Sequence, residues 1–185
     1  MSVRVHHRFT VEDYYRMAEV GVIPRGARVE LLDGQLVDMM PIGPFHSGVV
    51  TRLNNLFSKL SDDRWTVFCQ NPVRLDRHSE PQPDIMLVKN RADSYTRSHP
   101  APGDVFLLIE VADSSLDLDQ SDKLPAYGKA GIPEVWIVNL PERHVEIYRE
   151  PHFAGYSSAV TLREGETATP AAFPDVQISV SALLA

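Results

Sequence analysis

The stretch LLIEVADSSLDLDQSDKLPAYGKAGIPEVWIV, residues 107–138, decides the fold. It starts inside an apolar run that covers 105–111. A polar segment with helical spacing follows, and a second apolar run at 135–138 ends the stretch. Apolar runs without alternating polar residues are typical of strands that are covered on both faces. A helix that connects two such strands favours an α/β or α+β sandwich with a mixed sheet flanked by helices.

Other segments of the chain supply the rest of such a sheet. Thr10 with Asp13 three residues later is a helix-capping pattern, and Gly21 is a stop for that helix. Asp33-Gly34 between two short apolar runs predicts a β-hairpin. The predicted elements, in chain order, are a helix (9–21), a hairpin (27–40), a helix (46–62), strands (64–76, 83–88 and 105–112), a helical pattern (117–131), a strand pair (133–140 and 144–150) and one more strand in the tail.

The composition is that of one globular domain, which we expect to span residues 1–185. Apolar residues make up 43% and charged residues 23% of the chain, which is ordinary for a soluble protein. A single cysteine, Cys69, excludes an internal disulfide and a zinc site built from several cysteines. The N-terminus does not resemble a signal peptide, and no run approaches the ~20 apolar residues of a membrane span. We therefore expect a cytoplasmic protein with no membrane partner.

The formal net charge of −7 restricts the classes of partner. Sequence-independent binding of DNA normally relies on a surface of lysine and arginine that neutralises phosphates. The acidic composition argues against such a surface over the whole protein. It is compatible with a local basic groove, or with metal ions that offset clustered carboxylates.

One acid, Glu110, lies inside an apolar run, where an unpaired charge costs several kcal/mol to desolvate or shifts its pKa until it is neutral. A second acid, Asp84, begins the strand 83–88, where a side chain can be ordered and still reach solvent. If the two strands are neighbours, the two carboxylates converge. Carboxylates with water and a substrate phosphate are what Mg²⁺ requires. The bound ion can lower the pKa of a water and stabilise charge on a phosphodiester.

A cation for Glu110 is not supplied by its own strand. Side chains alternate along a strand, so residue 112 shares the face of Glu110, and this residue is Ala112. In the helical pattern that follows, Lys123, Tyr127 and Ala130 lie on one stripe, which we expect to face the sheet. A lysine on that stripe needs a partner. We therefore expect Lys123 to reach the open place beside Glu110.

Each of these residues also has a purely structural interpretation. Asp84 follows a proline and can be a turn residue at a strand start, and Glu110 can be an acid paired with an arginine. Lys123 can pair with Asp119 four residues earlier in a solvated contact. Glu30, which precedes the hairpin turn, can be one exposed position of that hairpin. The ordered set of acids with a sheet-facing lysine is more specific than any one of its members.

This set of motifs resembles the PD-(D/E)XK nuclease superfamily, which has the restriction-endonuclease-like fold, and within it the Uma-two family of endonucleases. The superfamily pattern is carried by the Pro83-Asp84 pair and by the strand that contains Glu110. The similarity to the Uma-two family covers most of the chain, through TVEDYYRM (10–17), VELLDGQLVDMMP (29–41), His46, PQPDIMLV (81–88), LLIEVADSS (107–115) and DKLPAYGKAGIPEVWIVNL (122–140).

The resemblance implies an αβββαβ core and a set of site residues. Asp84 and Glu110 would hold Mg²⁺ or Mn²⁺, and Lys123 would orient the attacking water or stabilise the transition state. Glu30 would join as an additional acid. His46 either packs at the start of its helix or supports the site through a hydrogen bond to an acid or a phosphate.

Two features need a special explanation within this family pattern. The lysine that usually follows the glutamate by two positions is absent and Ala112 stands there, so activity depends on Lys123 entering the site. Pro125 is tolerated in a helix only in its first turn, so we expect the helix to begin near Asp122.

The function expected from these residues is that of a Mg²⁺-dependent endonuclease that hydrolyses phosphodiester bonds of nucleic acid, DNA rather than RNA. Nucleases of this fold often act as dimers, so we expect a homodimer. One alternative is a catalytically inactive scaffold or partner-binding protein, which the acidic charge and the missing strand lysine favour. Another is a metal-dependent hydrolase of a smaller phosphodiester, such as a nucleotide.

Overall fold

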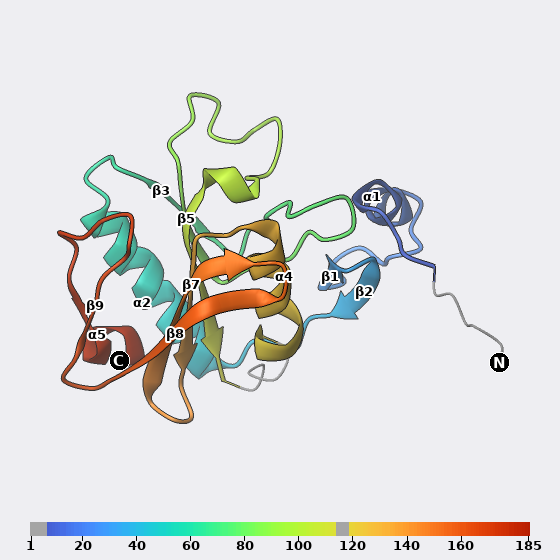
Figure 1. Ribbon diagram of the computed structural model, residues 1–185. Helices are drawn as coiled ribbons and strands as arrows, with labels where there is room; N and C mark the ends of the chain where they lie inside the picture. Colours follow the sequence, from blue (N-terminus) through green and yellow to red (C-terminus); the bar gives the residue numbers. More distant parts are fainter. Residues whose placement is uncertain (1–6, 114–118) are drawn as a thin grey trace.

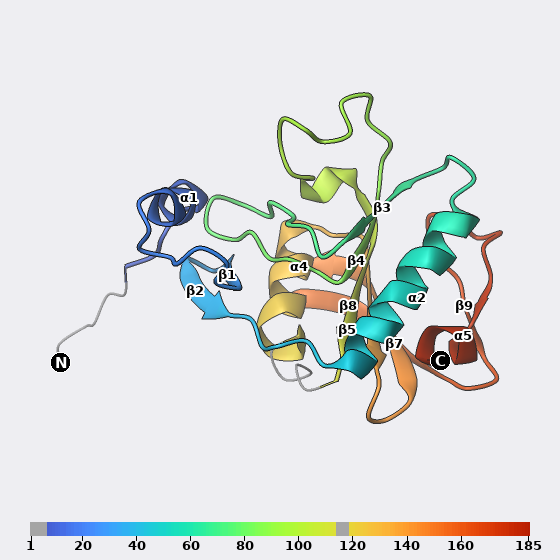
Figure 2. The ribbon, with the colours of Figure 1, turned by 180° about the vertical axis from the view of Figure 1, so that it is seen from behind.

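The structure, a computed structural model, describes residues 7–113 and 119–185. A mixed sheet of six strands lies at its centre, with helices on both faces (Figures 1 and 2). This arrangement confirms the fold class expected from the sequence. The strands lie in the order β3 (Thr66–Cys69), β4 (Ile85–Val88), β5 (Val105–Ala112), β6 (Glu134–Asn139), β7 (His144–His152) and β8 (Gly155–Arg163).

The elements outside this sheet include the helices on its two faces and several short segments. They are α1 (Val11–Glu19), β1 (Val29–Leu32), β2 (Gln35–Asp38), α2 (Pro44–Leu60), the 3₁₀ turn η1 (Pro102–Asp104), the π-helical turn η2 (Asp119–Lys123), α4 (Leu124–Ala130), β9 (Thr167–Ala168), β10 (Ile178–Ser179) and α5 (Val180–Leu184).

The two apolar runs form the central strands β5 and β6, as expected. Among the described residues of the sheet they are its one parallel pair, and the other neighbouring strands are antiparallel. Parallel neighbours need a crossover connection, which here includes α4. Figure 2 shows α4 on one face of the sheet and α2 on the other. From α2 to β6 the main elements therefore follow the expected αβββαβ order.

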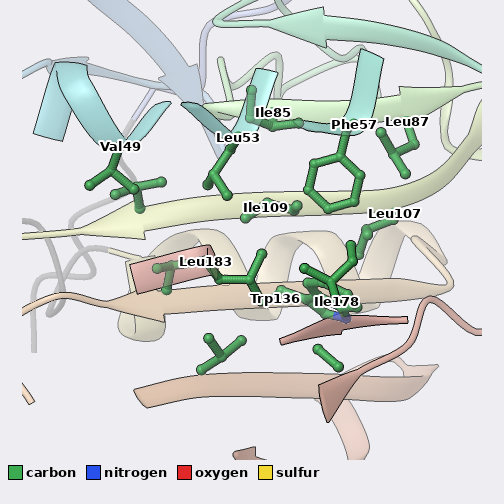
Figure 3. Packing of buried hydrophobic residues seen from close by; sticks show 14 of the residues in the cluster. Val49, Leu53, Phe57, Ile85, Leu87, Leu107, Ile109, Trp136, Ile178 and Leu183 are labelled. Carbon is green, nitrogen blue, oxygen red and sulfur yellow. The ribbon is translucent and has the colours of Figure 1, made fainter. Parts of the chain in front are cut away.

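Alternation along β5 divides the core into two layers. Leu107 and Ile109 pack toward α2, whereas Leu108 packs toward α4, in a layer that includes Tyr127. Glu110 shares the face of Leu108 because side chains alternate with a period of two. Figure 3 shows the layer on the α2 side, to which the labelled residues Val49, Leu53, Phe57, Ile85, Leu87, Leu107, Ile109, Trp136, Ile178 and Leu183 belong.

Helix α1 and the β1–β2 hairpin lie on the α4 side of the sheet (Figures 1 and 2). The expected capping box is present, since the Thr10 hydroxyl accepts from the Asp13 amide and the Asp13 carboxylate accepts from the Thr10 amide. The expected hairpin is present too. Both of its turn residues have positive φ, 47° at Asp33 and 77° at Gly34, as a type I′ turn requires.

The strand expected at 64–76 is much shorter in the structure. It ends at Cys69 because Gln70 has a left-handed φ of 51°, and Pro72 has no amide hydrogen for a strand ladder. The tail contains the expected strand as β8, and also the β9–β10 pair and α5, which the sequence pattern did not predict.

The helical pattern at 117–131 is an α-helix only from Leu124, two residues after the expected start at Asp122. Pro125 lies in the first turn of α4, as its chemistry requires. The π-helical turn η2 precedes it, and the beginning of the pattern falls on 114–118, outside the described residues. No helix within the described ranges is long and apolar enough to span a membrane.

The position of α4 depends on a close approach between helix and strand at Gly128. A Cβ atom at this residue would lie 2.1 Å from the carbonyl oxygen of Gly155, the first residue of β8. No change of rotamer could relieve that contact, because the obstructing atom belongs to the backbone. Glycine therefore lets α4 lie this close to the sheet, and the approach helps to fix the neighbouring Tyr127.

We expect Gly128→Ala to lower the free energy of unfolding by about 1–3 kcal/mol, because α4 must overpack against β8 or move away from it. Urea denaturation followed by tryptophan fluorescence measures the loss. Gly103→Ala is the matched control, since a Cβ atom there would meet nothing within 4 Å. Equal stability of the Gly128→Ala variant and the wild type would contradict the packing argument.

Candidate active site

A buried ammonium group lies among three carboxylates. Lys123 Nζ is 3.4 Å from Glu30 Oε1 and 3.4 Å from Glu110 Oε1. It is also 3.8 Å from Asp119 Oδ1. The exposed fraction is 6% for Lys123, 1% for Glu30, and 3% for both Glu110 and Asp119. Lys123 thus occupies the place beside Glu110 that Ala112 leaves open in the strand.

Three elements bring these groups together from distant parts of the chain. Glu30 belongs to β1, whose residues are all buried, and Glu110 belongs to the central strand β5. Lys123 is the last residue of the π-helical turn η2. Such turns are rare and are frequent at functional sites. The turn places Lys123 directly before α4, so the lysine points at the sheet from the crossover between β5 and β6.

Asp84 lies beside Glu110, where β4 begins and β5 ends. Ile85 pairs with Ile109 in the antiparallel register, so residue 84 continues that register opposite Glu110. The Asp84 amide donates to Glu110 Oε2 at 3.4 Å, and the Val111 amide donates to Asp84 Oδ2 at 2.9 Å. The structure therefore brings together the two carboxylates that the sequence analysis selected.

Two side chains hold the Asp84 carboxylate in place. His46 Nε2, from the first turn of α2, lies 3.1 Å from Asp84 Oδ2, and Gln70 Nε2 donates to Oδ1 at 3.1 Å. Burial opposes ionisation of Asp84, but the contacts with His46, the Val111 amide and Gln70 outweigh it and lower its pKa. The hydrogen bond with Asp84 in turn raises the pKa of His46. Asp84 is therefore ionised at neutral pH.

Glu110 has the opposite electrostatic environment. Burial raises its pKa to about 8, although the charge of Lys123 and a hydrogen bond from Tyr127 act in the other direction. The neighbouring acids Asp119 and Asp84 raise it further. For Lys123, burial favours the neutral amine, but the surrounding carboxylates outweigh it and raise the pKa of the ammonium group. The lysine is therefore charged, and Glu110 shares its neighbourhood with more acids than one cation can neutralise.

The contacts also decide between the structural interpretations of the acids and the lysine. Glu30 is not an exposed hairpin position, since it is 1% exposed and paired with Lys123. The pair between Lys123 and Asp119 exists, but it is buried and is one contact of three. Among the described residues, Glu110 forms its ion pair with Lys123 and not with an arginine.

The sequence left two interpretations of His46 open, packing at the start of its helix or a hydrogen bond to an acid or a phosphate. In the structure His46 hydrogen-bonds an acid, Asp84. The structure thus gathers Glu30, His46, Asp84, Glu110 and Lys123 in one place, and their catalytic and metal-binding roles stay predictions.

Tyr127 has a contact that the sequence analysis missed. It is fully buried on the sheet-facing stripe, as expected, but its hydroxyl also donates to Glu110 Oε1 at 2.6 Å. The sequence feature that could have predicted this contact is the spacing of four residues between Lys123 and Tyr127, which places both side chains on one face of a helix. Gln70 was missed as well, and its position after β3 in a left-handed conformation follows from no pattern in the sequence.

Lys123 and the carboxylates around it line a pocket of about 260 Å³. The described residues contain no ready-made group of three or more His, Cys, Asp or Glu that could hold a metal ion. Two adjacent carboxylates still fit Mg²⁺, which usually takes one or two acids and completes its octahedron with water and substrate oxygens. The pocket is lined by Arg28, Glu30, Met39, Met40, Pro41, Ile42, Gly43, His46, Gln82, Asp84, Glu110, Asp113, Asp119 and Lys123.

We expect Lys123→Met to destabilise the protein more at high pH than at low pH. Removing one partner of a buried ion pair costs roughly 3 kcal/mol when the other partner stays charged. The pKa of Glu110 is raised in the folded protein, so protonation of this acid favours folding. That contribution is present below the unfolded pKa of ~4.3 and is lost as the pH rises through about 8. Without Lys123, the free energy of unfolding should fall more over this pH range, because the ionised form of Glu110 no longer has a cation beside it.

Urea denaturation at pH 5 and pH 8 measures this difference. Lys129→Met, which removes an exposed lysine of α4, is the control and should change the free energy of unfolding by less than ~0.5 kcal/mol at either pH. A Lys123→Met variant as stable as the wild type at pH 8 would contradict the role of Lys123 in holding the acids together.

Comparison with known proteins supports the fold and identifies the family of the chain. Among solved structures, the chain is similar to a "putative nuclease belonging to DUF820" from Anabaena variabilis, with a TM-score of 0.70 and 16% sequence identity over 95% of this chain and 97% of that chain. At this identity the likeness shows the fold alone. No curated protein matches the chain. The model of the Uma2 family, described as "Putative restriction endonuclease", matches residues 11–181, so the chain belongs to the Uma2 family.

Proposed function

We propose that the protein is a Mg²⁺-dependent endonuclease, with Mn²⁺ as a substitute ion, that hydrolyses phosphodiester bonds of nucleic acid. The observation that carries the proposal is the convergence of Asp84, Glu110 and Lys123 on one pocket. Membership of the Uma2 family supports a nuclease. The adjacent carboxylates support the metal ion, and this ion together with Lys123 would offset the charge of an anionic substrate.

Asp84 and Glu110 would hold the metal ion, which when bound supplies a Lewis acid that lowers the pKa of a water and stabilises charge on the phosphate. Asp84 is ready for this role because its hydrogen bonds favour the charged form. Glu110 is oriented by Tyr127 and Lys123, which both contact Oε1, while Oε2 lies on the side of Asp84. The two strands therefore aim one oxygen-rich face at the pocket.

Lys123 would orient the attacking water or stabilise the negative charge that develops on the phosphate. Its ammonium can act this way because the surrounding carboxylates keep it charged in a buried place, where charges interact more strongly than in water. Glu30 is the additional acid that would hold Lys123 from the hairpin strand β1, and His46 would position Asp84.

The finer features of the proposal concern the partner, the assembly and the location. We propose DNA rather than RNA as the substrate, a homodimer as the assembly and the cytoplasm as the location. A catalytically inactive scaffold is less favoured, because a fold without chemistry would gain more stability from apolar side chains than from four buried ionisable groups, Glu30, Glu110, Asp119 and Lys123.

Wild-type protein should bind Mg²⁺ or Mn²⁺ with micromolar to millimolar affinity, and Asp84→Ala and Glu110→Ala should each abolish binding, because two carboxylates are the protein's share of the ligands. Isothermal calorimetry measures this. Both variants should also cut a labelled DNA at least about 100-fold more slowly than wild type. Asp175→Asn, which changes an exposed acid, is the control and should leave both properties intact.

Metal binding that is indifferent to both Asp84→Ala and Glu110→Ala would rule out this site. Metal binding by the wild type without cleavage of any nucleic acid would instead favour the scaffold.

We expect Tyr127→Phe to weaken metal binding about tenfold, because side chains that orient a ligand typically contribute that much. The loss of one hydrogen bond should lower the free energy of unfolding by only about 1 kcal/mol. Tyr156→Phe is a matched control, since the Tyr156 hydroxyl donates to the carbonyl of Ile132 at 2.9 Å and does not touch the site. Equal metal affinities of the two variants would mean that Tyr127 is a packing residue without a positioning role.

A further inference from the structure

The pocket of the proposed site has two unlike walls. One wall carries the acids and Lys123. The other is formed by the segment between β2 and α2, with the side chains of Met39, Met40, Pro41 and Ile42. Met40 is 66% exposed, so this apolar wall extends from the pocket to the surface of the protein. An exposed apolar wall next to carboxylates that would hold a metal ion suits a ligand that is itself part apolar and part anionic.

The groups proposed for catalysis are deeply recessed behind this entrance. Asp84 is 9% exposed, Lys123 6% and Glu110 3%. The pocket of about 260 Å³ is slightly below the ~300–1,000 Å³ that is usual for small-molecule sites. A pocket of this volume has room for no more than about one nucleotide, so a base-paired duplex cannot enter it. A phosphate held in a regular duplex would have to leave its helical path to reach Glu110.

The chemistry of the lining points in the same direction. Base faces in a duplex are covered by stacking, so they offer little apolar surface to Met39 or Met40. An unpaired base exposes both faces, and packing it on an apolar wall removes that surface from water. Duplex binding relies on many phosphate contacts from lysine and arginine. The described residues that line the pocket include two such cations, Arg28 and Lys123, in a chain with a net charge of −7.

We propose that the protein binds and cuts an unpaired nucleotide strand, which is either a single strand or the unpaired end of a duplex. An unpaired base packs on Met39, Met40 and Ile42, and Arg28 neutralises a phosphate at the entrance. The adjoining phosphodiester enters the pocket, where a water oxygen loses a proton and forms a new P–O bond, one ester P–O bond breaks, and the departing oxygen takes up a proton and leaves as an alcohol. This inference rests on the proposed nuclease function and narrows its substrate class.

Binding is tested first, with Ca²⁺ in place of Mg²⁺ so that affinity is measured apart from turnover. Fluorescence anisotropy compares one labelled DNA strand alone, the same strand in a blunt duplex, and the same strand in a duplex with an unpaired end. The same three oligonucleotides are repeated as RNA of the same sequence, which shows whether the unpaired strand is DNA or RNA. The single strand and the unpaired end should bind at least about tenfold more tightly than the blunt duplex.

The contribution of the apolar wall is tested with Met40→Ser, which should weaken single-strand binding about fivefold, because part of one apolar side chain no longer covers the base. Val160→Ser is the control. It replaces a half-exposed apolar residue of β8, at the far edge of the sheet, and should leave single-strand binding unchanged. Equal effects of the two substitutions would overturn the role of the wall.

Cleavage is then measured in Mn²⁺ on the same oligonucleotides and on bis(p-nitrophenyl) phosphate, a small diester without strands or bases. Preferred cleavage of the unpaired strands supports the inference. Cleavage of the blunt duplex as fast as the single strand would overturn it and leave the nuclease standing. Failure to hydrolyse any oligonucleotide or the small diester would overturn the proposed nuclease function, and the inference with it.

Discussion

The structure depends on how one ammonium group is held away from water. Removing Lys123 from solvent is costly unless carboxylates replace its hydration shell, and Glu30, Glu110 and Asp119 do this. Glu30 comes from the hairpin, Glu110 from the central sheet, and the lysine from the crossover that joins the two parallel strands. Separating the hairpin from the crossover would break the Glu30–Lys123 pair, and separating the crossover from the sheet would break the Glu110–Lys123 pair. The lysine therefore couples the hairpin to the sheet as well as completing the site.

An asymmetry between the two strand-end acids follows from this arrangement. Asp84 accepts hydrogen bonds from His46, Gln70 and a backbone amide, so its charged form is favoured and its pKa is lowered. Glu110 lies deeper, among other acids, and burial raises its pKa to about 8. Two carboxylates with pKa values pushed in opposite directions are a recurrent feature of catalytic sites. Here the difference arises because hydrogen bonds from polar groups favour the charged form of Asp84, whereas burial and the neighbouring acids disfavour the charged form of Glu110.

The sequence predicted those features that depend on local pattern. Apolar runs identified the central strands, Asp33-Gly34 the hairpin turn, and the empty place at Ala112 led to Lys123. Features that depend on long-range contacts escaped prediction. The π-helical turn has no periodic signature, and the partners of Asp84 include Gln70 from an irregular segment. Glu30 could not be recognised as buried from its strand, because whether a hairpin position is exposed depends on which element covers it.

The acids of the recessed site contribute to the acidic net charge of the chain. A site built from several carboxylates and one lysine adds negative charge to the chain, so long-range electrostatic attraction cannot be its means of drawing a polyanion to the pocket. For the proposed substrate, recognition would then come from short-range contacts at the entrance, where Met40 is exposed and Arg28 is the one lysine or arginine besides Lys123 in the described lining. Burial of the acids, which strengthens their hold on Lys123, also keeps most phosphates at a distance. Under the proposed function, the same packing that stabilises the charges would therefore limit which strands can reach them.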